Sequence, residues 1–566
     1  MVYTLITTLC LVAAAFSPAV STTPTPFEVP WSDDTIGPDG PWHAITAEDG
    51  QYKLFPGSTW ETWLIQDDYC TAVESGTCYA EEAGLYDKVA SQGSNGGISM
   101  PVSLSNYIFG LNVTGDDATR WVDSLRLQNF EVENASLALL DGGQRMVYPS
   151  GKNYSFFAGC LSLGGSGSVN QSFTQADASL PWANASLIPG YMWEHGKIPS
   201  NSFGMHIGSV QPALAGSLWF GGYDQNRVIG DIITLDGDFR DGITLWDIGI
   251  DVIGNSSPFD FDTQDGLLTK GNSTMGRSLK VSIDGCSPYF SLPKSTCDNI
   301  ASYLPVTFDE GLGLYLWDTN STQFSQIVSS ASAVYFSFIS SSNTDPIKIR
   351  VPFMHLNLTL ETPLVDDPTP YFPCHVNGKN QYVLGRAYLQ DAFIGANWDP
   401  RSAKWWMAQA PGQNIQAVPN VATIEPTSKT ISKGGNNWEA SWSGIWSDEV
   451  DYTASSSSKA TSTTTPSIIA TEGKVGLTLG AKIGIGVGIV AGLLAIALGV
   501  FFLWRRRRQQ TQTSQSPTQP PSRWTEYKYS SSQSHPVEMM DQCLPVELRG
   551  MPSPDPNRKH ERHELP

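Results

Sequence analysis

An apolar run near the C-terminus limits which parts of this chain can fold as a globular domain. Residues 483–504 carry no charge, and four arginines, Arg505 to Arg508, follow them directly. About 20 apolar residues span the hydrocarbon core of a bilayer, and a basic flank marks the cytoplasmic side. We therefore predict a single-pass transmembrane helix at 483–504 with a cytoplasmic C-terminus, so that the folded part lies before it and outside the cell.

The remaining boundaries follow from composition. The run Leu5 to Phe16, followed by small residues, predicts a cleaved signal peptide at 1–21. Residues 453–471 are almost entirely Ser, Thr and Ala, so we predict a Ser/Thr-rich stalk at 412–482. The segment 505–566 is rich in Gln, Ser and Pro and predicts a disordered cytoplasmic tail, whose partner the sequence does not name. These boundaries predict a folded ectodomain at 22–411. We expect the secretory pathway to deliver it to the cell membrane.

Charge and sequons agree with an extracellular ectodomain. Lys and Arg number 34 against 55 Asp and Glu, a net charge of −21, which argues against a nucleic-acid partner. Every N-x-Ser/Thr acceptor falls between the predicted signal peptide and the predicted membrane span, which predicts a glycoprotein. The acceptors are Asn112, Asn134, Asn153, Asn170, Asn184, Asn255, Asn272, Asn320 and Asn357.

Alternation of apolar and polar residues predicts a mainly β ectodomain. Period-2 segments bounded by Gly, Asn, Asp and Pro are typical of half-buried strands, and long stretches with the helical period are scarce. The clearest segments are 98–104, 136–140, 279–283, 334–339, 347–351 and 355–360.

The ectodomain contains an even number of cysteines, Cys70, Cys78, Cys160, Cys286, Cys297 and Cys374. In an oxidising compartment these predict disulfides, and the short loop makes Cys70–Cys78 the safest pair; the other pairings stay open at this level. No C-x-x-C occurs, so we expect no zinc site and no other metal. Motifs for metalloproteases, serine hydrolases and phosphate-binding loops are also missing, and no cofactor is predicted.

Four segments in register point to one family. They are Phe55-Pro-Gly-Ser-Thr-Trp-Glu-Thr-Trp63, Gly216-Ser-Leu-Trp-Phe-Gly-Gly-Tyr-Asp224, Val281-Ser-Ile-Asp284-Gly-Cys-Ser-Pro-Tyr-Phe-Ser-Leu-Pro293 and Val383-Leu-Gly385. From about Phe27 to Pro411 the chain resembles the pepsin-like aspartic proteases (peptidase A1), especially their membrane-anchored fungal relatives. The resemblance implies a bilobal fold, with lobes at about 22–225 and 226–411 and a cleft between them.

The resemblance also implies one catalytic Asp from each lobe, in an apolar-Asp-Thr/Ser-Gly turn. Two carboxyl groups about 3 Å apart cannot both ionise, so they share a proton and act together as acid and base. This chain departs from that pattern. Counting back from Trp63 places Pro56 in the first Asp position, followed by Gly57 and Ser58. Asp284 remains in the second turn, but Gly285 and Cys286 follow it.

Further implications of the resemblance concern the cysteines and the flap. It pairs Cys297 with Cys374, which leaves Cys160 and Cys286 to form a bridge between the lobes beneath the cleft. A flap hairpin is not recognisable between Ile98 and Gly115. Asp33, Asp34, Asp67 and Asp68 lie in flanking segments and are weaker candidates to replace the missing acid. An Asp-Gly turn with a satisfied carboxylate explains Asp284 equally well.

The leading interpretation is a cell-surface pseudo-protease that binds or senses extended peptides in its cleft. Asp284 is the only catalytic candidate, and losing one member of a catalytic unit costs on the order of 10⁴-fold in rate. Two alternatives remain: an active membrane-tethered aspartic endopeptidase, and a passive wall or surface glycoprotein.

Overall fold

The computed structural model describes residues 23–447 except 73–77, 89–100, 103–106, 116, 176–178, 180, 342 and 377–379. The chain divides into two units, 1–460 and 461–566, and every described residue belongs to the first. The predicted signal peptide (1–21), membrane span (483–504) and cytoplasmic tail (505–566) lie outside the described residues. Within the part that is described, none of the helices has the length and apolar character needed to span a membrane.

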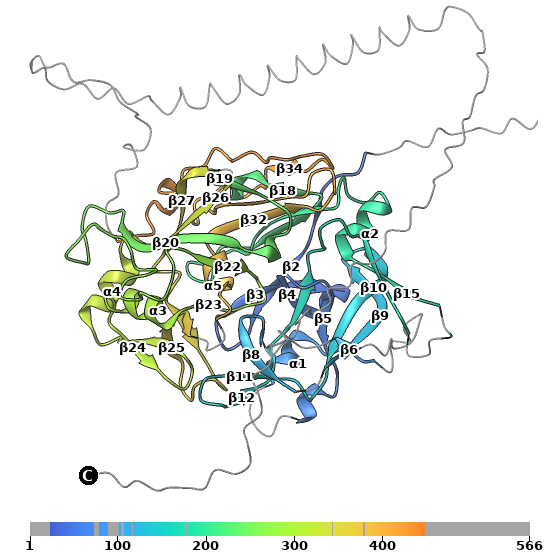
Figure 1. Cartoon of the computed structure of the whole chain (residues 1–566), viewed down its shortest axis with the longest axis horizontal. Helices are drawn as coiled ribbons and strands as arrows, with labels where there is room; N and C mark the ends of the chain where they lie inside the picture. The colour runs from blue at the N-terminus through green and yellow to red at the C-terminus, as the bar shows by residue number, and fades with distance from the viewer. Residues whose placement is uncertain are drawn as a thin grey trace, which may run out of the picture. The chain divides into compact units, whose positions relative to one another are not determined.

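The described part of the chain consists mainly of β-strands, as the alternating segments predict (Figure 1). Three of the predicted segments are found at β22 (Leu279–Ile283), within β26 (Ser332–Ser340) and within β27 (Asn343–Pro352), and a fourth ends β10 (Phe130–Leu140). The segment predicted at 355–360 is a strand only at β28 (Leu358–Leu360), because residues 353–356 form a turn. Of the segment predicted at 98–104, β6 (Pro101–Val102) is described as a strand, and the rest lies outside the described residues.

The N-terminal half is built on a mixed sheet in the order β14-β15-β10-β5-β13-β4-β3-β2, with β9 beside β10 and β6 beside β9. A smaller sheet, β12-β11-β8-β7, lies beside it. The strands not yet given are β2 (Trp31–Ile36), β3 (Trp42–Ala47), β4 (Tyr52–Gly57), β5 (Thr62–Ile65), β7 (Tyr107–Ile108), β8 (Leu111–Thr114), β9 (Ala118–Leu127), β11 (Arg145–Val147), β12 (Asn153–Tyr154), β13 (Gly159–Ser162), β14 (Asn170–Phe173) and β15 (Ala183–Ser186). The helices are η1 (Glu48–Gly50), η2 (Tyr69–Ala72), α1 (Tyr79–Ala83) and α2 (Ile188–Glu194).

The C-terminal half has a sheet in the order β27-β26-β20-β22-β31-β23-β30, with β21 beside β20, and a smaller sheet β24-β25-β29-β28. Its further strands are β20 (Ile243–Val252), β21 (Thr263–Gln264), β23 (Phe290–Leu292), β24 (Val306–Asp309), β25 (Leu314–Trp317), β29 (Thr369–Phe372), β30 (Cys374–Val376) and β31 (Val383–Leu384). Its helices are η4 (Phe239–Asp241), α3 (Lys294–Ala301), α4 (Thr322–Ser329) and α5 (Arg386–Leu389).

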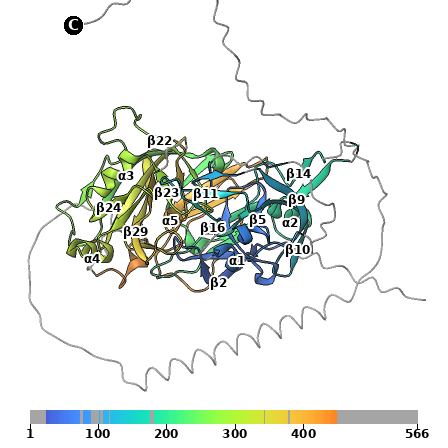
Figure 2. The same cartoon turned by 90° about the horizontal axis from the view of Figure 1, so that it is seen from below.

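A third sheet, β1-β17-β16-β32-β33-β19, joins the halves, because its strands come from both. Figure 2 shows α2 and β14 at one end of the molecule, α3 and β24 at the other, and β16 between them. The strands are β1 (Phe27–Glu28), β16 (Ser202–His206), β17 (Ser217–Phe220), β19 (Ile229–Asp236), β32 (Ala392–Asn397) and β33 (Lys404–Gln409). The predicted lobe boundary near 225 falls at η3 (Gln225–Arg227), just before β19.

The two halves repeat one strand arrangement. In the first, β4 pairs in parallel with β13, β13 antiparallel with β5, and β5 in parallel with β10. In the second, β22, β31, β23 and β30 have the same order and directions. The end of β4 in one half therefore corresponds to the end of β22, where Asp284 follows, in the other.

The folded part extends beyond the boundary predicted at 411, so residues 412–447, which the sequence assigned to the stalk, belong to the folded domain, and residues 448–482 lie outside the described residues. Residues 412–447, here called the C-terminal strap, include β34 (Val421–Thr423), which pairs with β18 (Gly222–Asp224), and η5 (Ala440–Trp442). Trp438, Trp442 and Trp446 are buried, and the last two rings stack at 5.1 Å. These apolar side chains, spaced four apart in a polar segment, hold the strap on the domain.

Candidate functional site

Asp284 lies in a tight turn at the end of β22. Its backbone N–H donates to the carbonyl oxygen of Leu384 on β31 at 3.2 Å, and its own carbonyl accepts from Ser287 N–H at 3.2 Å. The half-buried strand Leu279–Ile283 therefore delivers a carboxyl group to the interior, where the Asp284 residue is 9 % exposed.

The Asp284 carboxyl group is held by donors from both halves. Its Oδ1 accepts the backbone N–H of Ser58 at 3.0 Å and that of Cys286 at 3.1 Å, and its Oδ2 lies 3.4 Å from Ser287 Oγ. Burial raises the pKa of Asp284 above its usual value, while the hydrogen bonds from Ser58, Cys286 and Ser287 lower it. The carboxyl group is thus hydrogen-bonded across the boundary between the halves.

The loop that faces Asp284 carries no carboxyl group. It consists of Pro56, Gly57 and Ser58 at the end of β4. A side chain on Gly57 would place Cβ 2.6 Å from Asp284 Oδ1, and one on Gly285 would place Cβ 2.1 Å from the Pro56 carbonyl oxygen. The two loops therefore cross backbone to backbone, and glycine is required at both crossings.

The other acidic candidates do not complete a dyad. Asp33, Asp34, Asp67 and Asp68 are all exposed, and Asp34 pairs with Lys53 at 3.2 Å. Within the described ranges, the hydrogen-bond partners of the Asp284 carboxyl group are the three donors named above, and none is a second acid.

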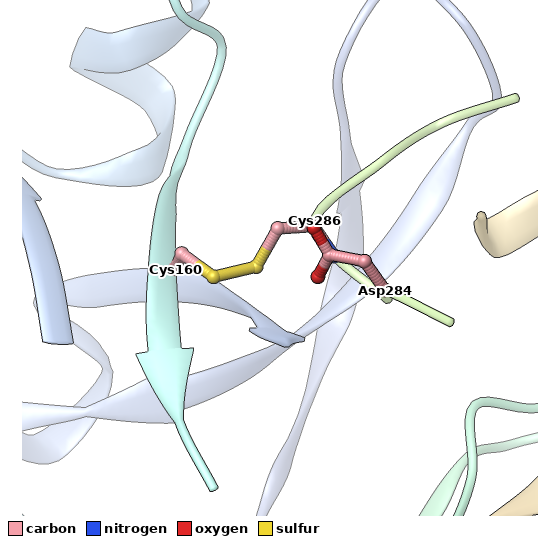
Figure 3. A group of neighbouring side chains, drawn as sticks. All are labelled: Cys160, Asp284 and Cys286. Atoms are coloured by element: carbon pink, nitrogen blue, oxygen red, sulfur yellow. A yellow bond between two sulfur atoms is a disulfide. The ribbon is translucent and has the colours of Figure 1, made fainter. Parts of the chain in front are cut away.

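The predicted bridge between Cys160 and Cys286 is present. Their Cα atoms lie 5.9 Å apart, inside the range that a disulfide needs. Figure 3 shows the bridge running from β13, in the N-terminal half, to the turn beside Asp284. The pairs Cys70–Cys78 and Cys297–Cys374 are also bonded, so the six cysteines of the folded part pair as the short loop and the resemblance imply.

A metal site at this position does not fit the residues. One ligand atom each of Cys160, Asp284 and Cys286 lies within 4.8 Å of the others. The thiolate is the form of cysteine that binds metals, and both sulfur atoms are instead bonded to each other. The three side chains therefore form a disulfide beside a carboxyl group.

Two arginines, the partly exposed Arg240 and the buried Arg386, hold the crossing loops, and the sequence reasoning missed both. Arg240 donates to the carbonyl oxygens of Ser58 and Gly164 and to Asp238 Oδ2 at 2.7 Å. Arg386 donates to the carbonyl oxygens of Gly285 and Cys286 at 3.2 and 2.9 Å.

Burial lowers the pKa of both guanidinium groups, while acidic neighbours, Asp238 for Arg240 and Asp39 for Arg386, raise it. Asp39 is itself buried and lies 3.4 Å from Arg386. Only Arg386 could have been found from the sequence, because it directly follows the Val383-Leu-Gly385 segment that carries the family resemblance.

A hairpin reaches over the turn, although no flap was recognisable in the sequence. It joins β7 to β8 through Phe109 and Gly110, both with positive φ. Ser291 Oγ, from the C-terminal half, donates to the Gly110 carbonyl oxygen at 3.2 Å, and the Phe109 ring meets the Trp63 ring edge-on at 6.0 Å. Its sequence signal is Phe-Gly between the two-residue strand Tyr107–Ile108 and the four-residue strand Leu111–Thr114, which is too short to identify a flap.

A cleft of about 440 Å³ opens beside Asp284. Ser58, Gly110, Lys280 and Tyr382 contribute to its walls, so both halves line it. Its volume lies within the range of about 300–1,000 Å³ that is typical of ligand sites.

The predicted glycosylation sites differ in exposure. Five acceptors are exposed: Asn153, Asn170, Asn184, Asn255 and Asn320. Asn112, Asn134, Asn272 and Asn357 are partly buried, and the side-chain oxygens of Asn112 and Asn357 are buried without a hydrogen-bond partner.

Comparison with known proteins identifies the family. The sequence model described as eukaryotic aspartyl protease matches residues 57–410, which is more than half of the chain. No curated protein matches. Among solved structures, the aspartic proteinase from Irpex lacteus is similar, with 11 % identity and a TM-score of 0.40, over 68 % of this chain and 98 % of that one. The chain belongs to the eukaryotic aspartyl protease family.

Proposed function

We propose that this protein is a membrane-anchored, cell-surface member of the family that binds extended peptides without cleaving them. The anchoring part of the proposal is supported by the apolar run 483–504 and the arginines after it. The sequons between the two apolar runs support exposure outside the cell. Protease protection on intact cells, with an epitope at each terminus, tests this topology.

The environment of Asp284 is the observation that supports the loss of catalysis. Aspartic proteolysis requires one ionised carboxylate to take a proton from water and one carboxylic acid to support the scissile carbonyl group. Asp284 faces Gly57 and the backbone N–H of Ser58, so the described site offers a single acid. One carboxyl group cannot fill both roles at once.

The remaining cleft supports peptide binding. Lys280 is exposed at the wall, Tyr382 is half-buried, and the Gly110 backbone supplies polar groups opposite them. A few fixed polar groups in a concave, partly apolar site suit an extended main chain. The hairpin tip held by Ser291 restricts the depth to which a peptide can enter.

Peptide hydrolysis by the purified full-length chain tests the catalytic part. A randomised peptide library, incubated between pH 3 and pH 7, should give no more product with the wild type than with Asp284→Ala. Hydrolysis that disappears in Asp284→Ala would establish the active endopeptidase and end the proposal.

Binding is tested separately, by fluorescence anisotropy with labelled members of the same library. We expect saturable binding that Tyr382→Ala weakens, with Trp182→Ala as the matched control because Trp182 is exposed away from the cleft. If no peptide binds, the passive surface glycoprotein is the better description.

A further inference from the structure

The hairpin between β7 and β8 closes one end of the cleft beside Asp284. The carbonyl oxygen of its tip residue Gly110 accepts a hydrogen bond from Ser291 Oγ at 3.2 Å. A side chain on Gly110 would place Cβ 2.8 Å from Ser287 Oγ, which itself lies 3.4 Å from Asp284 Oδ2. The tip therefore packs against the turn that carries Asp284, and a peptide chain does not fit between the two.

The space on the other side of the hairpin is too small for a peptide. It is a cavity of about 20 Å³, and its lining includes Phe109 and Leu111 of the hairpin together with Cys286 and Arg386. That volume holds about one water molecule, whereas the cleft has a volume of about 440 Å³. Among the described residues, Asp284 thus lies at the inner end of the cleft, and an extended chain that enters the cleft has to stop there.

The Asp284 carboxyl group has one oxygen atom available to a ligand. Oδ1 accepts two backbone N–H groups, whereas the partner of Oδ2 among the described residues is the Ser287 hydroxyl group at 3.4 Å, the longest of these contacts.

The same carboxyl group has no counter-ion in the described part of the chain. None of the ion pairs there includes Asp284, and Arg240 and Arg386, which interact with it electrostatically, are paired with other carboxylates. A buried charge without a counter-ion costs free energy. A cationic group at the end of a ligand would supply the missing positive charge.

The two ends of a peptide differ in what they bring to Asp284. An N-terminal ammonium group carries a positive charge and three N–H donors, as a lysine ammonium group does. A C-terminal carboxylate would place a second negative charge beside Asp284, which is unfavourable. We infer that the cleft holds peptides by their free N-terminal amino group, bound to Asp284 Oδ2. This inference rests on the proposed function, because it names the part of the peptide that the cleft recognises.

The other charged residues of the cleft are compatible with an ammonium group at Asp284. Arg240 donates to Asp238 and to two backbone carbonyl oxygens, so its guanidinium group is already engaged. Lys280 is exposed, and salt in the solvent screens its charge. Asp241 also lines the cleft, but it is exposed, so a cation gains less there than beside the buried Asp284.

Fluorescence anisotropy with one peptide library in three forms tests the inference. The label is at the C-terminus, and the N-terminus is a free amine, an acetylated amine or a des-amino residue. The assay is run at about pH 6.5, where an α-amino group is mostly protonated. We expect the full-length chain to bind the free-amine form roughly ten- to a hundredfold more tightly than either other form, as a hydrogen bond between charged groups contributes. The des-amino form separates charge from bulk, because it is smaller than the free amine whereas the acetylated form is larger.

Two variants assign the preference to one carboxyl group. Asp284→Asn keeps an oxygen atom for the backbone N–H groups but removes the negative charge, so it should bind the three forms equally. Asp241→Asn is the matched control, because it removes an exposed carboxylate from the same cleft, and it should keep the preference for the free amine. Circular dichroism melts establish that both variants are folded.

The outcomes separate this inference from the proposed function. Equal affinity of the wild type for the free-amine and des-amino forms would overturn the inference, while peptide binding itself would stand. A preference for the free amine that persists in Asp284→Asn would also overturn it, because another group would then bind the amine. If none of the three forms binds, the proposed function and the inference both fail.

Discussion

At the residue scale, Gly57 decides how closely the two central loops approach. An added Cβ would lie 2.3 Å from Cys286 Sγ and 2.8 Å from Cys160 Sγ, as well as against Asp284. We expect Gly57→Ala to lower the free energy of unfolding by about 1–3 kcal/mol, since a tightly packed site resists added volume. Gly276→Ala is the control, because nothing lies closer than 4.0 Å to its added Cβ. Equal urea midpoints for the two variants would contradict the tight crossing.

The bridge beside Gly57 allows a second residue-scale prediction. Cys160 and Cys286 are 126 residues apart in sequence, whereas Cys70 and Cys78 are 8 apart. In the chain-entropy description, the longer loop contributes about 2 kcal/mol more stability. The double variant Cys160→Ala/Cys286→Ala should therefore lose about that much more free energy of unfolding than Cys70→Ala/Cys78→Ala, measured by urea denaturation. A smaller loss would show that the bridge between the halves adds little.

At the element scale, the C-terminal strap is part of the folded domain. Trp442 is fully buried, and its ring lies 4.9 Å from the ring of His355. We expect Trp442→Ala to cost about 3–5 kcal/mol, as other truncations of large buried aromatic residues do. Trp182→Ala should stay within about 0.5 kcal/mol, because Trp182 is 59 % exposed. Thermal melts of the two variants measure the difference. Equal melting temperatures would mean that Trp442 does not hold the strap on the folded domain.

At the element scale, some strands could be predicted from the sequence, whereas the C-terminal strap could not. A strand such as β22 can be predicted from the alternation of apolar and polar residues, because one of its faces is buried and the other is partly exposed. The strap could not be predicted in this way, because its three tryptophans are separated by Glu, Ala, Ser, Gly and Ile in no strand pattern. They become informative only once Ile229 of β19 and Ala333 of β26 are known to pack against them. Arg240 and Arg386 are missed for a related reason: their partners, such as Ser58 and Asp39, lie more than 180 residues away in sequence. Asp284 and its facing loop were predictable because the family motif is local.

At the scale of the whole molecule, buried histidines set how the fold responds to acid. Burial lowers the pKa of His206 to about 3 and that of His375 to about 4, from 6.5. The folded state therefore binds fewer protons than the unfolded chain below pH 6.5, so these residues reduce stability as the pH falls toward 4. Asp39, Asp284 and Asp391 act in the opposite direction, because burial raises each pKa and the folded state then takes up protons first.

A substitution separates these opposing contributions. The ring of His375 packs against Tyr148 and Tyr289, and both of its nitrogen atoms are buried without partners, so phenylalanine can replace it without losing a hydrogen bond. Between pH 7 and pH 4, His375→Phe should lose about 3 kcal/mol less free energy of unfolding than the wild type, since each unit of pKa shift corresponds to 1.36 kcal/mol. Urea denaturation at a series of pH values measures the difference. Parallel curves for the two proteins would mean that His375 is not held neutral in the folded state.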